Sequence, residues 1–355
     1  KELMVMQEMP QPKKTFLLNR GQYDAPTKQV FPNTPEKILP FSNQLPKNRY
    51  GLAQWLTDAR NPLTARVAIN HLWQNFFGKG LVKTAEDFGN QGEMPSHLNL
   101  LDWLAIELRD NNWDIKKLNK LIVMSATYQQ DSKASPLLNE KDPENKLLAR
   151  GPSMRLSAEM IRDNALTASG LLNKKLGGKS VYPYQPEGLW EINGTKYNQD
   201  STDQVYRRSL YIVLKRTVPN PTLANFDGPS RASCVVRRQS TNTPLQALVT
   251  LNDPTFIEAA KVIGESITKQ QNTKAAIGLA YRQLTGITPT SKQIALLSAM
   301  QQAEYNKFKG NPNKIKGWIN AGLYKINKTL DPYWVAANSV VASTILNSDA
   351  TITKR

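Results

Sequence analysis

Residues 62–77 read PLTARVAINHLWQNFF, and this stretch decides the fold class. Pro62 suits the first turn of a helix, and no further proline or glycine interrupts the segment before Gly78. Apolar side chains recur at helical spacing on two faces, with Ala65, Ile69, Leu72, Trp73 and Phe76 on one face and Leu63 and Val67 on another. The segment therefore predicts a helix that is apolar nearly all round and buried.

Similar helix signals recur along the rest of the chain. Residue types that cap helix N-termini precede apolar runs at Ser96, Asp114, Ser157, Thr243, Thr290 and Asp331. We therefore expect a mainly α fold, with a multi-helix body, an extended proline-rich N-terminal arm and an irregular, partly β middle segment.

Composition divides the chain into four parts. Residues 1–48 are rich in proline and should form an extended arm that packs along the helical body through Phe16, Leu17, Leu18, Phe31, Ile38 and Leu39. Residues 49–172 form a helical domain, and residues 241–355 form a C-terminal helical part. Between them, glycine- and proline-rich residues 173–240 form an irregular basic segment with short strands, one of them expected at 209–215.

Charge and composition narrow the classes of partner and of site. The 355 residues contain 46 Lys and Arg against 29 Asp and Glu, which gives a net charge of +17. Such a charge favours nucleic acid, anionic lipid surfaces or acidic polysaccharides, unless it only solvates the surface. One cysteine excludes a disulfide framework and a multi-cysteine metal site, and two histidines leave little for a histidine-rich centre. We expect no metal site, and no apolar run is long enough to span a membrane.

A polar stripe crosses the apolar helix of residues 62–77. Arg66, Asn70 and Gln74 follow one another at four-residue spacing, and polar groups in apolar surroundings need hydrogen-bond partners or a cleft. The stripe is therefore a buried structural network or part of a binding site, with the network favoured. His97 is expected in the first turn of the next helix, where a neutral imidazole is preferred. It could ligate a metal or haem iron, although an isolated histidine is more often a packing residue.

Glu159, Arg162 and Asp163 share one face of the helix expected after Ser157. Two carboxylates a turn apart could act as a catalytic acid/base pair, with the arginine keeping one of them ionised. The alternative, an ordinary ion-pair cluster, is the commoner use of this pattern.

The segment 201–240 is the most arginine-dense part of the chain. Arginine forks bind phosphate, sulfate and carboxylate groups, and tyrosine rings can stack on ligands. The candidate binding residues here are Arg207, Arg208, Tyr211, Arg237 and Arg238. The competing interpretation is that these arginines hold irregular backbone together through its carbonyl groups. Cys234 lies among them, with no histidine nearby in sequence.

Several ordered blocks of the sequence together resemble a known family. They are NPLTARV (61–67), NHLWQ (70–74), FGKGLV (77–82), PSH (95–97), LDWLA (101–105), SATY (125–128), RLSAE (155–159), IRD (161–163), RRSLY (207–211), TPLQAL (243–248) and LND (251–253). This series resembles the C-terminal domain of unknown function 1553 found in planctomycete-type cytochrome c proteins of Planctomycetes and marine Bacteroidetes. The family has no established reaction.

The resemblance implies a location outside the cytoplasm, in the periplasm or at the cell surface. It also implies haem in an upstream domain and none in this chain, which contains no Cys-x-x-Cys-His motif. No leader follows Lys1, so we expect that a leader was removed or that the chain is part of a longer protein.

Three functions are compatible with these observations. The leading hypothesis is a module of a larger cytochrome c-like protein that engages an anionic polysaccharide or a partner domain. The alternatives are a glycan-active enzyme that uses Glu159 and Asp163, and a scaffold that docks a haem domain. Nucleic acid is not expected as a partner because no recognition motif accompanies the charge.

Overall fold

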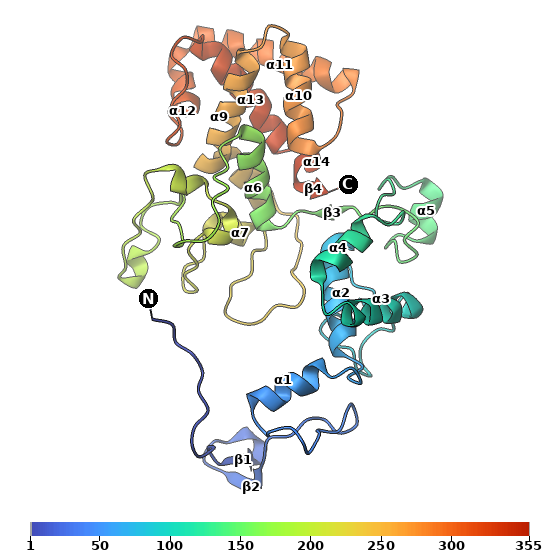
Figure 1. Cartoon of the computed structure of the whole chain (residues 1–355). Coiled ribbons are helices and arrows are strands. Elements are labelled where there is room, and N and C mark those ends of the chain that lie inside the picture. The colour runs from blue at the N-terminus through green and yellow to red at the C-terminus, as the bar shows by residue number, and fades with distance from the viewer. Residues whose placement is uncertain (1, 355) are drawn as a thin grey trace. The chain divides into compact units, whose positions relative to one another are not determined.

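The computed structural model describes residues 2–354 and is mainly helical, as the sequence predicted (Figure 1). Two small two-stranded antiparallel sheets accompany the helices. Contacts group the chain into two compact units. Unit 1 comprises the described residues up to Gln130 together with Ala134–Arg150, and unit 2 comprises Asp131–Lys133 and the residues from Gly151 onward. The division into four parts expected from composition stays a prediction.

The N-terminal arm of unit 1 contains a β ladder that the sequence did not indicate. Strands β1 (Thr15–Leu18) and β2 (Pro26–Val30) pair through the turn η1 (Asn19–Gly21), where Arg20 adopts a φ of 49°. Of the six expected apolar anchors, five are exposed and only Leu39 is buried. The indole N–H of Trp55, on α1 (Arg49–Thr57), donates to the Leu39 carbonyl at 2.8 Å. The arm therefore packs on the helices near residue 39 rather than along its whole length.

The core of unit 1 is built on the segment that decided the fold class. Helix α2 (Thr64–Phe77) buries Ile69, Trp73 and Phe77 and ends at Gly78, whose φ of 79° suits glycine. Helices α3 (Leu98–Asp110) and α4 (Ile115–Val123) add Leu101, Leu104, Leu108, Leu118 and Ile122 to the same core. A short helix, α5 (Pro136–Lys141), completes the unit.

Unit 2 is a helical bundle around two buried helices, α9 (Pro254–Thr268) and α13 (Pro332–Leu346). Small side chains let these helices approach closely, and a Cβ placed on Gly264 would lie 2.6 Å from the Ser339 backbone nitrogen. Several other helices pack around them, and most of these are labelled in Figure 1. These are α6 (Ala158–Ser169), α8 (Pro244–Asn252), α10 (Thr273–Thr285) and α11 (Ser291–Gly310), with the short helices α7 (Pro221–Asn225), α12 (Lys316–Ile319) and α14 (Asp349–Ile352).

The ends of unit 2 meet in its small sheet, where β3 (Met154–Arg155) pairs with β4 (Thr353–Lys354). The capping boxes predicted at Thr243 and Thr290 are present at α8 and α11. Among residues 2–354, no helix combines the length and the apolar character that crossing a bilayer requires.

The middle segment is irregular, as predicted, but the strand expected at 209–215 is wrong. The backbone there forms short 3-10 helices, η3 (Asp203–Tyr206) and η4 (Ser209–Tyr211), and only isolated bridges such as Val181 to Ile212. Side chains of α6 bond the backbone of residues 205–209, so those groups are not free to form a continuous ladder.

Glu258 and Lys261 form a stripe of buried charged residues on α9 that hydrogen-bonds the loop before α13. The Glu258 carboxylate accepts hydrogen bonds from the hydroxyls of Tyr184 and Tyr206, each at 2.9 Å, and from the Tyr324 backbone N–H. The Lys261 ammonium donates to the carbonyls of Ala321 and Tyr324. Burial lowers the pKa of Lys261 from its usual value. These groups are satisfied within the fold, which makes the stripe structural.

Candidate functional site

Helix α6 places two carboxylates one turn apart on the same side of unit 2. Its N-cap is Ser157, whose hydroxyl accepts from the Met160 backbone N–H, and its apolar face is buried in the unit 2 core. Glu159 and Asp163 remain partly accessible, with side chains 24% and 22% exposed. The two carboxylates therefore lie one turn apart on a helix, as the sequence predicted.

Glu159 is paired with Arg238 from the loop that precedes α8. The two guanidinium nitrogens Nη1 and Nη2 donate to the two carboxylate oxygens at 2.6 and 3.1 Å, which is a bidentate fork. Burial alone would raise the pKa of Glu159, but the hydrogen bonds and the charge of Arg238 outweigh it and lower that pKa below its usual value. Glu159 is therefore held as an ion.

Asp163 is fixed by Ser209 at the start of η4. Its Oδ1 atom accepts from the Ser209 backbone N–H at 2.8 Å and from the Ser209 hydroxyl at 2.7 Å. The Nε atom of Arg208 lies 4.0 Å from the other carboxylate oxygen, and the Arg208 side chain is 46% exposed. No local pattern singles out Ser209, because its partner is 46 residues away in the chain.

Arg162, a candidate catalytic residue, has a structural position. Its side chain is buried and donates to the carbonyls of Val205 and Arg207 and to the Ser209 hydroxyl. Burial lowers its pKa from the usual arginine value, with the nearby Asp163 charge opposing that effect. The guanidinium thus holds residues 205–209 against α6 instead of facing a ligand.

Arg207, a candidate binding residue, is also buried, at 2% exposed. Its guanidinium donates to the carbonyls of Lys175, Gly177 and Lys179 and lies 3.9 Å from the centre of the Tyr211 ring. The Tyr211 hydroxyl in turn accepts from the Gly177 backbone N–H at 2.8 Å. For Arg207 and Tyr211 the structure matches the competing interpretation, in which arginine holds irregular backbone together.

The last two candidate arginines of the middle segment lie on an exposed loop, together with the cysteine. Arg237, Arg238 and Cys234 are exposed there. The base of this loop is anchored by Asp227, whose carboxylate accepts from the backbone N–H and the hydroxyl of Thr241 at 2.7 and 2.9 Å. These hydrogen bonds fix the base of the loop close in sequence to Arg238, which pairs with Glu159 on α6.

The polar stripe of unit 1 forms a network within that unit. Arg66 pairs with Asp102 on α3 at 2.6 Å, and this hydrogen bond lowers the pKa of Asp102. Asn70 is fully buried and bonds both the N–H and the carbonyl of Val82, at 2.8 and 3.0 Å. The Oε1 atom of Gln74 is buried without a partner in the described part of the chain. The network favoured on sequence grounds fits Arg66 and Asn70.

His97 lies one residue earlier in its helix than expected. It is the N-cap residue of α3 rather than part of the first turn, and Nδ1 of its half-buried side chain lies 3.1 Å from the Ser96 hydroxyl. Within residues 2–354, no three His, Cys, Asp or Glu side chains gather as potential metal ligands.

Comparison with models of protein families identifies the family of this chain. The family model described as "Protein of unknown function (DUF1553)" matches residues 48–301, which is most of the chain. The search of curated proteins and the search of solved structures each returned no match.

Proposed function

The chain belongs to the DUF1553 family, and on that premise we propose that unit 2 is a binding module for an anionic polysaccharide. Its anion-binding groups are the guanidinium groups of Arg208 and Arg238. Its setting is an extracytoplasmic protein, in the periplasm or at the cell surface, in which any haem belongs to an upstream domain and this chain carries no cofactor.

One observation carries the proposal, namely that two arginines from different loops stand next to carboxylates one helical turn apart. Because the rise of a turn is about 5.4 Å, the Glu159 and Asp163 pairs bring Arg238 and Arg208 to neighbouring positions on α6. A guanidinium has five donors, and Glu159 occupies two of those of Arg238. Donors remain for a second anion, which the net charge of +17 would attract.

The same geometry supports binding better than glycan hydrolysis. Hydrolysis of a glycosidic bond needs one carboxyl group that holds a proton and delivers it to the leaving oxygen. Glu159 is held ionised by Arg238, and Asp163 is occupied by two hydrogen bonds from Ser209. Glu159 therefore does not supply that proton, and Arg162 is buried among backbone carbonyls of residues 205–207.

The proposal is tested by binding isotherms with a sulfated and a neutral polysaccharide at low and high salt. The sulfated polymer should bind more tightly, and salt should weaken it, because exposed ion pairs are screened beyond about 8 Å at physiological ionic strength. The variant Arg208→Ala/Arg238→Ala should lose most of this preference.

The matched control is Lys314→Ala/Lys316→Ala, which removes two exposed positive charges from the same unit. It should reduce binding less than the arginine variant, since a lysine cannot make the paired contacts of a guanidinium fork. Equal losses in the two variants would show that net charge alone attracts the polymer. Equal affinity for the two polysaccharides would overturn the proposal and favour a partner domain as the ligand of this face.

A further inference from the structure

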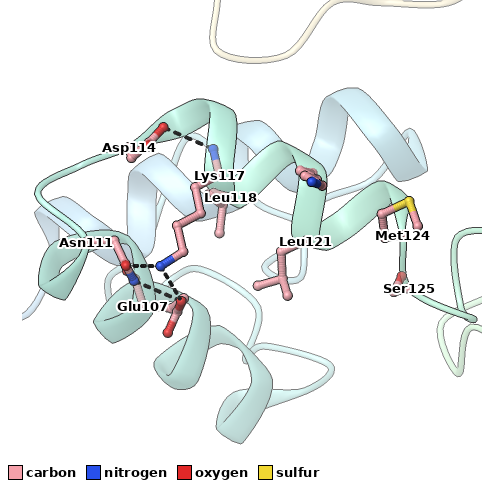
Figure 2. Close-up of a pocket in the computed structure, with 9 residues that line it drawn as sticks. Glu107, Asn111, Asp114, Lys117, Leu118, Leu121, Met124 and Ser125 are labelled. Carbon is pink, nitrogen blue, oxygen red and sulfur yellow. Dashed lines mark hydrogen bonds and ion pairs between the residues drawn. The ribbon is translucent and has the colours of Figure 1, made fainter.

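Unit 1 contains a cavity whose lining includes none of the candidate site residues discussed above. It has a volume of about 450 Å³ and lies where the end of α3 faces α4 (Figure 2). Small-molecule sites in proteins usually have volumes of about 300–1,000 Å³, lined by apolar side chains with a few polar groups. This cavity has the size and the mixed lining of such a site.

The apolar part of the lining comes from one side of α4. Leu118 is buried in the unit 1 core, whereas Leu121 and Met124 line the cavity while 39% and 64% exposed. Methionine has three rotatable bonds and a polarisable sulfur, so it adapts to ligands of different shape. These two exposed side chains offer a surface for a short hydrocarbon chain.

The polar part of the lining is largely occupied by its own hydrogen bonds. Figure 2 shows Lys117 reaching from α4 to Asn111 and Glu107. Glu107 also accepts from the Asn111 side chain at 2.8 Å, and Asp114 caps α4 by accepting from the Lys117 backbone N–H at 3.0 Å. Both carboxylates of the lining are therefore engaged.

Lys120 is the exception among the charged residues of the lining. It lies on α4 directly before Leu121, and its ammonium forms no hydrogen bond or ion pair within residues 2–354. The charge that remains available to a ligand is therefore the positive charge of Lys120. The same lining contains the apolar side chains of Leu121 and Met124.

We propose that this cavity binds a small amphipathic anion, a carboxylate with a short hydrocarbon chain. The carboxylate pairs with Lys120, and the chain lies on Leu121 and Met124. The site shares no residue with the proposed anion site of Arg208 and Arg238, which belongs to unit 2.

The test uses the full chain with methionine methyl groups labelled with carbon-13. The Met124 resonance is assigned by its loss in Met124→Leu, and it is followed during titration with decanoate, decanol, decyltrimethylammonium and acetate. Decanoate should shift this resonance saturably and bind most tightly. Decanol should bind more weakly, and the cationic amphiphile and acetate more weakly still.

The role of the Lys120 charge is tested with Lys120→Gln. The matched control is Lys116→Gln, because Lys116 is an exposed lysine of the same helix outside the lining. Lys120→Gln should weaken decanoate binding about two- to fivefold, the range of an exposed ion pair, and leave decanol unchanged. Equal effects of the two lysine variants would overturn the proposal. So would decanol binding as tightly as decanoate, or the absence of any saturable shift at Met124.

Discussion

The side chain of Asn70 is fully buried in α2 and hydrogen-bonds both the N–H and the carbonyl of Val82. Its position inside an apolar surround indicated that it needs a hydrogen-bond partner. The partner itself, the backbone of Val82, has no sequence signature because any residue offers the same N–H and carbonyl. The same limit applies to Arg207, whose three acceptors are backbone carbonyls of a loop some 30 residues earlier in the chain. The residue types indicated that these side chains need hydrogen-bond partners, but only the fold identified the partners.

Asn70→Leu should destabilise unit 1 markedly. The change leaves the N–H and the carbonyl of Val82 buried without partners, at about 1–3 kcal/mol for each group. Thermal denaturation measures the effect, with His71→Ala as the control on the exposed side of the same helix. An Asn70→Leu protein as stable as the His71→Ala protein would contradict the role assigned to Asn70.

The Glu159–Arg238 pair gives a prediction about pH. The folded-state pKa of Glu159 lies below its usual value of 4.5, so the stabilisation is present above that pH and is lost as pH falls through the folded-state value. The free energies of unfolding of the wild type and of Arg238→Ala, measured with urea, should therefore differ by about 0.2–1 kcal/mol at pH 7. The two values should converge as the pH falls from 4.5. A difference that persists or grows in acid would contradict the ion pair.

At the scale of elements, capping residues located helices well. Asp114, Ser157, Thr243, Thr290 and Asp331 each precede a helix, because their side chains accept from its first free N–H groups. The middle segment was harder. An apolar run such as 209–215 suggests a strand, but side chains of α6 hold the adjoining backbone and no neighbouring strand pairs with it continuously. Long-range bonds of this kind leave no local pattern.

The packing of α9 against α13 gives the sharpest prediction at this scale. Gly264→Ala should destabilise unit 2 by about 1–3 kcal/mol, because the new Cβ would meet the Ser339 backbone and neither helix can move freely. Gly310→Ala in α11 is the control, since a Cβ there meets nothing within 4 Å. It should be neutral or slightly stabilising, as alanine favours helix over glycine. Denaturant unfolding measures both, and a stable Gly264→Ala protein would show that the helices pack less closely.

For the whole molecule, the two units have separate cores and should unfold separately. The core around Ile69 and Leu101 belongs to unit 1, and that around Phe256 and Val341 to unit 2. Calorimetry should resolve two transitions. Asn70→Leu should lower the midpoint temperature of one of them, and Gly264→Ala should lower that of the other. A single transition that both variants lower equally would mean that the chain unfolds as one cooperative body. The sequence did not locate this boundary, because helices occur on both sides of it.

The proposed function assigns anion binding to the exposed arginines at α6, whereas the buried arginines bond backbone carbonyls of the fold. Arginine side-chain NMR spectra, recorded during titration with a sulfated oligosaccharide, test it directly. The Nε–H resonances of Arg208 and Arg238 should shift saturably, and those of the buried Arg162 and Arg207 should remain in place. Saturable binding that leaves Arg208 and Arg238 unmoved would contradict the claim.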